Sequence, residues 1–365
     1  MKILDWYIIR KYLGSFFFTA FLFTLIAMVI DFSEKAEKFV DASKVLSLGE
    51  ILGQYHLNYI PFINGLLWPL FSLIAVIFFT SRLAYNSEII SILNAGVSFP
   101  RLLRPYLVAA SLLTVILLIA NHFIIPIANK PKLEFERRFI KRSSDRLTTG
   151  TNMHFFISPD TKVYLRSYSA ADSLGYSFRL EKFRGTTLIY MLKAQFLEWN
   201  KETRNSWKIR DYEIRTYEDS VETITLHPNQ QIDTALNILP SDFEFYSKKK
   251  DLMTTPELQA LVDKERSRGL NPVKVYINEI QRRTADPFTI LILTVIGVAI
   301  AGRKVRGGLG LHLALGIALG SVFVFISKFS IVFSRSPNIP SVLGIWLPNI
   351  IFAIIAYRLV RKAQQ

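Results

Sequence analysis

Six long apolar runs, three on each side of a polar middle, constrain this chain more than any other feature. They cover residues 12–32, 57–81 and 102–127 before the middle, and residues 287–301, 309–333 and 339–357 after it. Several reach the ~20 residues that a helix needs to cross ~30 Å of hydrocarbon. The middle, residues 131–283, is charged and rich in Tyr, Phe and Thr. The pattern predicts a polytopic α-helical membrane protein with six transmembrane helices and an inserted extramembrane domain.

The composition narrows the kinds of site that such a chain can carry. Its net charge of +15 would suit nucleic acid, but in a membrane protein it indicates orientation and attraction to anionic lipid. The absence of cysteine excludes disulfides and thiolate metal sites, and the five His are too scattered to predict a metal site. The first apolar run is too long for a signal peptide, so we expect it to remain as a span.

The distribution of basic residues in the short loops predicts the orientation. Twelve Lys and Arg lie on the side of the N-terminus, and four lie in the short loops on the other side. Basic residues concentrate in short cytoplasmic loops, whereas long domains are translocated regardless of their charge. We therefore expect a multi-pass membrane protein with both termini cytoplasmic and the inserted domain outside, which is the periplasm if the cell is Gram-negative.

The inserted domain, residues 131–253, has the alternation of β-strands. Strands are predicted at 161–168, 176–183, 186–199, 207–218 and 221–226. No helical stretch interrupts them, which favours an all-β domain, an antiparallel sandwich, jelly roll or barrel, over an α/β fold. Alternate apolar residues such as Leu188, Tyr190 and Leu192 are either ordinary core or a row that receives acyl chains.

Helical segments surround this domain. Residues 1–130 are predicted to hold the first three spans, residues 254–286 to form a helical connector, and residues 287–365 to hold the last three spans. The chain contains no Walker A motif and no kinase or hydrolase signature, so no cofactor of its own is predicted. Energy must then come from a partner or an ion gradient. No acidic residue lies in the middle of an apolar run, which argues against a proton-coupled carrier.

A short amphipathic helix is predicted between the second and third spans, at about residues 83–95. Gly96 and Pro100 mark its end. A rigid helix at this place could dock into a soluble partner protein that supplies energy, with the Glu88 carboxylate contacting an Arg of that partner. A solvated loop helix whose Glu88 faces water explains the same pattern.

Lysines near the end of the first run could bind lipid phosphate. Lys35 and Lys38 are three residues apart and would share a helix face. The alternative is local pairing, since Asp31–Lys35 and Glu34–Lys38 are both spaced by four residues, which is worth only ~0.3–0.5 kcal/mol per pair. This second interpretation is the simpler one.

The fifth run carries a small-residue face and one lysine. Gly316 and Gly320 are spaced as in helix interfaces that allow close approach. Lys328 lies near the end of the same run, where it could extend to the lipid headgroups or contact lipid phosphate.

Four stretches of the chain resemble the LptF/LptG (YjgP/YjgQ) permease family. They are SRLAYNSEIISILNAGVS, NILPSDF, NEIQRRTADPFTILILTVIGV and IPSVLGIWLPNIIFAIIAYRLVRK. The first is the most specific, because the family shows a Ser-Glu pair followed by apolar residues and an Ala-Gly. Here these are Ser87, Glu88, Ala95 and Gly96. The C-terminal stretch is slightly closer to the LptG branch.

The resemblance implies a membrane subunit of the ABC transporter that extracts lipopolysaccharide from the inner membrane. In that family two permease subunits pair with a cytosolic ABC ATPase dimer, which binds the ATP. Lipid passes over a periplasmic jellyroll to bridge proteins of similar fold. The resemblance also implies that Glu88 lies on the coupling helix, that Lys35 and Lys38 lie near lipid phosphates, and that the first and fifth spans form the gate.

Two other classes of function remain open from the sequence. One is an ion-driven transporter of another amphiphile, and the other is a structural envelope scaffold. Only the lipopolysaccharide permease requires a bound ATPase, so co-purification separates the three.

Overall fold

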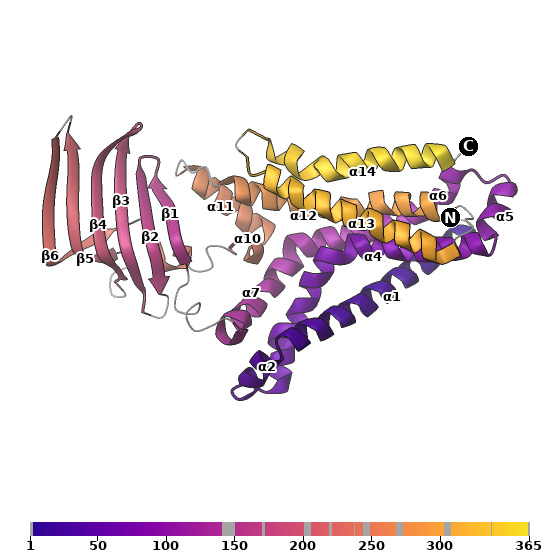
Figure 1. The fold of residues 1–365 in the computed structure, drawn as a ribbon, viewed down its shortest axis with the longest axis horizontal. Coiled ribbons are helices and arrows are strands. Elements are labelled where there is room, and N and C mark those ends of the chain that lie inside the picture. The colour runs from indigo at the N-terminus through magenta and orange to yellow at the C-terminus, as the bar shows by residue number, and fades with distance from the viewer. Residues whose placement is uncertain are drawn as a thin grey trace. The chain divides into compact units, whose positions relative to one another are not determined.

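The computed structural model describes residues 3–140, 150–169, 172–200, 206–218, 221–236, 238–243, 249–267, 273–302, 308–336 and 338–363. The chain divides into two compact units. Residues 1–132 and 274–365 form a helical unit, and residues 133–273 form the inserted unit. Figure 1 shows that the helices from the two ends of the chain lie together in one bundle.

Six helices of the described chain are long and apolar enough to cross a membrane. The first is α1 (Ile3–Glu34). The second joins α3 (Leu48–Ile51), a π-helical turn (Leu52–His56) and α4 (Leu57–Tyr85). The third joins α6 (Phe99–Ile119), a π-helical turn (Ala120–Ile124), α7 (Ile125–Phe135) and a last π-helical turn (Glu136–Ile140). The others are α12 (Val273–Ala301), α13 (Gly308–Phe333) and α14 (Ser341–Ala363). The predicted six-helix membrane architecture is confirmed.

Two helices differ from the predicted runs. The helix face predicted for Lys35 and Lys38 requires the first helix to run on without a break, but α1 ends at Glu34 and α2 (Ala36–Ser43) starts after a break at Lys35, which has φ −113° and ψ 12°. The fourth starts earlier than its apolar run, because α12 already begins at Val273. The segment predicted as a connector therefore holds α11 (Thr255–Ser267) and the first half of α12.

The core of the helical unit joins segments that are far apart in the sequence. Tyr12 of α1 is fully buried, and its hydroxyl lies 2.6 Å from Ser72 Oγ of α4 and 2.8 Å from Thr294 Oγ1 of α12. Tyr106 of α6 packs against the Tyr12 ring, with 6.1 Å between the ring centroids. These contacts hold α1 against helices from both ends of the chain.

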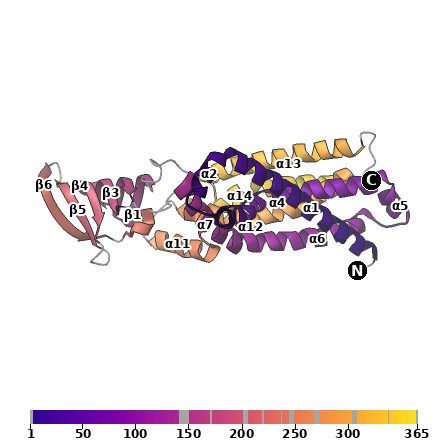
Figure 2. The same ribbon diagram turned by 90° about the horizontal axis from the view of Figure 1, so that it is seen from below.

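The inserted unit contains one six-stranded antiparallel sheet whose strand order follows the sequence (Figure 2). Its strands are β1 (Gly150–Ser158), β2 (Thr161–Ser169), β3 (Leu174–Arg184), β4 (Thr187–Trp199), β5 (Ser206–Glu218) and β6 (Val221–Ala235). The all-β, jellyroll-like insertion is confirmed. All five predicted strands are present, whereas β1 was not predicted and β6 extends well beyond residue 226.

One face of the sheet buries the aromatic core of this unit. Trp207 is fully buried and donates from Nε1 to the carbonyl of Ile238, at 3.0 Å. Tyr168 and Phe243 pack edge-to-face against its ring, at centroid distances of 6.4 and 5.6 Å from Trp207. Phe243 belongs to the short helix α9 (Pro240–Phe243), which lies in the NILPSDF stretch; α10 (Lys249–Leu252) follows it.

Candidate functional site

The predicted coupling helix is present as α5 (Glu88–Asn94), between α4 and α6. It is shorter than predicted, because α4 continues to Tyr85. Ser87 separates the two helices with a left-handed φ of 61°, and Gly96 follows α5 with a φ of 83°. Glycine adopts this conformation without steric cost, which explains why the helix ends there. The family-like residues Ser87, Glu88, Ala95 and Gly96 thus define the two ends of one short helix.

The two faces of α5 differ. Ile89 is buried in the main hydrophobic core, and Ile92 and Leu93 pack against that core. Glu88 is only partly buried, and the Nδ2 of Asn86 donates to its Oε1 over 3.3 Å. Ala95 at the end of the helix is exposed. The helix is therefore fixed to the bundle by its apolar side, while the carboxylate of Glu88 is accessible to an external partner.

An ion pair connects the segment after α5 to the start of α1. Both terminal nitrogens of Arg101, in the first turn of α6, donate to the two carboxylate oxygens of Asp5 over 2.8 Å. Such bidentate pairs fix relative orientation as well as distance. The α5–α6 loop and the first turn of α1 are thus joined at one end of the bundle.

The two lysines at the end of α1 are in different situations. Lys35 Nζ forms an ion pair with Asp31 and donates to the Tyr55 hydroxyl over 2.5 Å. This agrees with the local-pairing interpretation for Lys35. Lys38 lies beyond the break, on α2, and within the described chain it forms no ion pair with Glu34. Because of this break, Lys35 and Lys38 do not lie on one face of a continuous helix, which the prediction of a joint phosphate site had assumed.

The glycines of α13 pack inside the chain. A Cβ added to Gly316 would lie 2.2 Å from Ile77 Cδ1 of α4, and one added to Gly320 would lie 2.6 Å from Leu70 Cδ1. Both glycines are buried, so this face brings α13 close to α4. Ala314 points elsewhere and is exposed. The small residues on α13 therefore serve an interface within the subunit.

Lys328 of α13 borders a small cleft of about 80 Å³ between α4, α12 and α13. Arg282 and Asp286 of α12 line the same cleft. Lys328 is exposed and forms no ion pair with any residue that the structure describes. Its ammonium is therefore accessible to an anionic group at the cleft.

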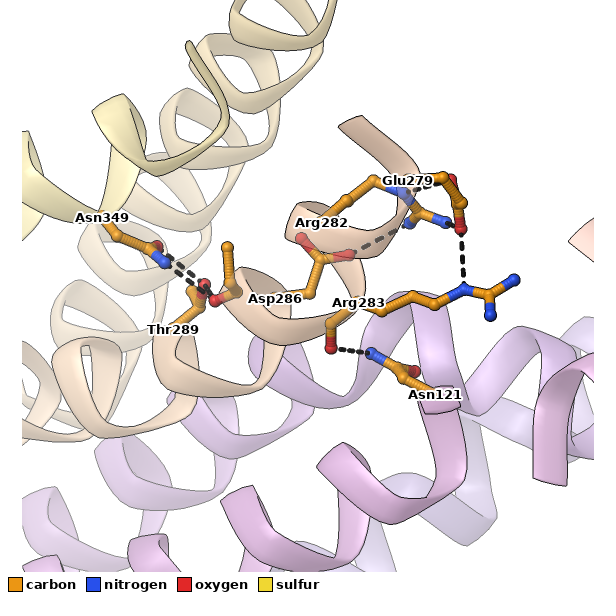
Figure 3. A network of polar contacts seen from close by, with 8 residues as sticks. Asn121, Glu279, Arg282, Arg283, Asp286, Thr289 and Asn349 are labelled. Carbon is orange, nitrogen blue, oxygen red and sulfur yellow. Dashed lines mark hydrogen bonds and ion pairs between the residues drawn. The ribbon is translucent and has the colours of Figure 1, made fainter. Parts of the chain in front are cut away.

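A network of charged side chains on α12 was not predicted (Figure 3). Arg282 donates to Glu279 over 2.8 Å and to Asp286 over 3.0 Å, and Arg283 donates to Glu279 over 3.2 Å. Glu279 and Arg283 are almost completely buried. Their spacings of three and four residues in NEIQRRTAD could have identified the network, had the helix been predicted to begin at Val273.

The network is linked to two other spans. Asn121, at the end of α6, donates to the carbonyl of Arg283 over 3.3 Å. One turn further along α12, Thr289 donates to Asn349 of α14 over 2.9 Å, and Asn349 donates to the carbonyl of Ala285 over 2.8 Å (Figure 3). Polar groups that face the interior of the bundle are therefore paired across helices.

The β-sheet carries a ladder of charged residues on β4, β5 and β6. Glu213 accepts from Lys193 at 3.1 Å and from Arg215 at 3.0 Å, and Arg215 also pairs with Glu222 at 3.1 Å. The hydrogen bond from Lys193 is the main reason that the pKa of Glu213 lies below its ordinary value of 4.5. In the row of alternating residues, Leu192 belongs to the core and Tyr190 packs against it.

Within the described residues, no group of three or more His, Asp or Glu side chains could hold a metal ion. The features that stand out are instead an accessible short helix, exposed lysines near the ends of the spans and long apolar spans. They suit docking and the handling of an amphiphile.

The family comparison is consistent with this arrangement. The model of the lipopolysaccharide export system permease LptF/LptG matches residues 6–362, nearly the whole chain. The chain belongs to the LptF/LptG family. No curated protein sequence matches it. The family model describes both branches together, so the LptG-like character of the C-terminus remains a prediction. Membership makes this chain a multi-pass membrane permease of lipopolysaccharide export.

Proposed function

We propose that this chain is one of two membrane subunits of an ABC transporter that extracts lipopolysaccharide from the inner membrane. The chain itself hydrolyses no ATP in this proposal. Its partners are a cytosolic ABC ATPase dimer, a second LptF/LptG-type subunit and periplasmic jellyroll bridge proteins that accept the lipid from the β-sheet unit. Both termini are cytoplasmic, and the sheet is periplasmic.

The observation that carries the proposal is the docked helix α5. Its apolar side is fixed to the core through Ile89, while Glu88 remains accessible between two spans. A partner that pushes on α5 would also act on α1, through the Arg101–Asp5 ion pair. In the proposal, α1 is one of the gate helices, so this linkage would connect ATP hydrolysis to the opening of the gate.

A groove beside α1 supports the role of a second subunit. It has a volume of about 720 Å³ and runs between α1, α4 and α13, with Arg10 and Lys11 at one end and apolar residues such as Phe18 and Phe78 along it. Large exposed apolar surfaces mark contacts with lipid or protein. We propose that α1 and α13 face the second subunit here and enclose the lipid between the two chains.

Basic residues would contact the phosphates of the lipid. Lys328, exposed beside Arg282, is the strongest of the three predicted contacts. Lys38 is partly exposed and is the second. Lys35 already contacts Asp31 and Tyr55, so a phosphate would have to compete with both.

The test is binding of the ATPase to Glu88 variants in the purified complex. A charge-assisted hydrogen bond contributes ~1.5–3 kcal/mol, so Glu88→Ala should weaken ATPase association about tenfold or more. Glu88→Lys should weaken it further, because it places a cation against the proposed Arg of the partner. Glu37→Lys is the matched control, since Glu37 is exposed on α2 at the opposite end of α1. Full ATPase binding by Glu88→Lys would contradict the proposal.

One observation favours the alternative of an ion-driven transporter. Asp286 lies within the continuous helix α12, although the sequence suggested that acidic residues avoid the spans. It is paired with Arg282 over 3.0 Å, which is the arrangement of a structural ion pair. If transport were driven by protons, Asp286→Asn would abolish it and an ionophore would stop it. The ABC mechanism predicts that an ionophore has no effect.

A further inference from the structure

A second groove runs along the other side of α1, apart from the groove assigned to the second subunit. It has a volume of about 800 Å³ and lies between α1, α4 and the turn that joins α6 to α7. Phe17 and Phe32 mark its two ends on α1. They are 15 residues apart, so at 1.5 Å per residue the groove is about 22 Å long.

The width of this groove limits its occupant. Volume divided by length gives a mean cross-section of roughly 36 Å² for the space that the groove itself holds. An extended hydrocarbon chain is narrow enough and has the required length.

The polar side chains inside the groove are satisfied within the protein. Asn64 Oδ1 accepts from Trp68 Nε1 over 2.9 Å and from Thr24 Oγ1 over 3.2 Å, and its Nδ2 donates to the carbonyl of Ile60. The rest of the lining is almost entirely apolar. An occupant needs no polar group along its length, which again describes an acyl chain.

The end of the groove near Phe32 is different. His56 lines this end, and Asp31 lies next to Phe32 in the chain but not in the groove lining. Both residues are more than nine-tenths buried, and within the described chain Asp31 Oδ2 and His56 Nδ1 have no hydrogen-bond partner. The two residues are neighbours through Tyr55, whose hydroxyl donates to Asp31 Oδ1 over 3.2 Å and whose ring centroid lies 5.2 Å from that of His56. A buried polar atom without a partner costs ~1–3 kcal/mol.

These two atoms define the chemistry of the missing partner. A carboxylate only accepts hydrogen bonds, and His56 Nδ1 accepts when the ring proton is on Nε2. A phosphate oxygen cannot donate to either atom. A primary ammonium has three donors and no acceptor, and it would share the Asp31 carboxylate with Lys35, whose Nζ already pairs with Oδ1. Phe32, half exposed beside His56, presents an aromatic ring that also attracts cations.

We propose that this groove binds a bilayer phospholipid with an ammonium headgroup, its acyl chain lying between α1, α4 and the α6–α7 turn and its ammonium at Asp31 and His56. The site is separate from the proposed path of lipopolysaccharide. Its occupant would fill the space beside α1 and support the outer part of that helix, which has few contacts of its own. The proposal requires neither ATP nor export.

The test uses the full chain in vesicles that contain a phospholipid with a photoactivatable acyl chain. The headgroup is ethanolamine in one sample and glycerol in the other. We expect labelling of residues 17–32, with the ethanolamine lipid preferred about tenfold or more, which is the effect of one charge-assisted hydrogen bond. The net charge of +15 would by itself favour the anionic glycerol lipid, so bulk attraction cannot produce this preference.

Variants separate the headgroup from the chain. Asp31→Asn should abolish the headgroup preference and leave labelling in place. Ala120→Phe should reduce labelling by both lipids, because Ala120 lines the groove. Leu25→Trp fills the same groove from an exposed position, in case Ala120→Phe does not fold. Ile30→Phe is the control, since Ile30 is exposed on α1 outside the groove lining.

Two results would overturn the proposal. Equal labelling by both lipids in the unchanged protein would mean that ordered water alone satisfies the two polar atoms. A headgroup preference that survives Asp31→Asn would mean that the headgroup does not bind at Asp31. Unchanged labelling in both groove-filling variants would show that the acyl chain lies elsewhere. All of these readouts are independent of ATPase binding, so they do not depend on the outcome for the transporter proposal.

Discussion

The hydroxyl of Tyr12 joins α1 to both α4 and α12. It lies 2.6 Å from Ser72 Oγ and 2.8 Å from Thr294 Oγ1, and all three side chains are fully buried. Tyr12→Phe removes this hydroxyl but keeps the ring. Ser72 and Thr294 are 3.2 Å apart and can still bond each other, so neither is left without a partner.

The expected cost of this change follows from those contacts. Two hydrogen bonds at a net ~0.6–1 kcal/mol each give a loss of about 1–2 kcal/mol in the free energy of unfolding. Interhelical hydrogen bonds in membranes average ~0.6 kcal/mol in double-mutant cycles, with a maximum of ~1.7. Tyr12→Ala also removes a buried ring and should cost ~3–5 kcal/mol.

The measurement is unfolding by SDS titration in mixed micelles, with a double-mutant cycle of Tyr12→Phe and Thr294→Val. We expect a coupling energy of about 0.6–1.7 kcal/mol between the two positions. If the two changes are additive, the hydroxyl does not hold α1 to α12, and the anchoring role assigned to Tyr12 is wrong.

Three further predictions concern other parts of the chain. Gly316→Leu should separate α13 from α4 and lower the free energy of unfolding by several kcal/mol. Ala318→Leu, at an exposed position of the same helix, should change it little. Equal SDS midpoints for the two variants would contradict the close packing of Gly316 against α4. Cysteines at Thr186 of the sheet and at Val45 should both react with a membrane-impermeant reagent in intact spheroplasts, and labelling only after lysis would reverse the orientation. Because the folded pKa of Glu213 is lowered, its ion pairs stabilise the sheet above pH 4.5 and are lost as the pH falls through the lowered value. Hydrogen exchange of β4 and β5 should therefore speed up as the pH falls through that value, and it should do so less in Glu213→Gln. An identical pH response in Glu213→Gln would refute this role.

Much of the fold could be predicted from hydropathy and alternation. The six spans and five of the six strands depend on local periodicity, which the sequence displays directly. The strand β1 could not be predicted because its pairing with β2 is what stabilises it, and its own alternation is weak. The break at Lys35 was missed because no Gly or Pro marks it in the sequence. The Lys35 side chain pairs with Asp31 and donates to the hydroxyl of Tyr55, which lies 20 residues further along the chain.

The candidate site was predictable where its residues act locally. The C-terminal end of α5 follows from Gly96, whereas its start was predicted at residue 83 and lies at Glu88. Long-range contacts could not be predicted from the sequence. The sequence does not show that Arg101 meets Asp5 or that Tyr12 reaches Thr294, because the residues of each pair are brought together only by packing. The charge network around Arg282 was missed for a different reason, since it lies in a polar stretch that the hydropathy pattern left outside the span.

The most direct test of the proposed function is the release of lipopolysaccharide from proteoliposomes that contain this chain, its second subunit and the ATPase. Transfer to a soluble jellyroll acceptor is measured with and without ATP, and with a proton ionophore. The ABC mechanism predicts that transfer requires ATP hydrolysis, is insensitive to the ionophore and is lost in Glu88→Lys. Transfer that proceeds without ATP, or that the ionophore abolishes, would contradict it.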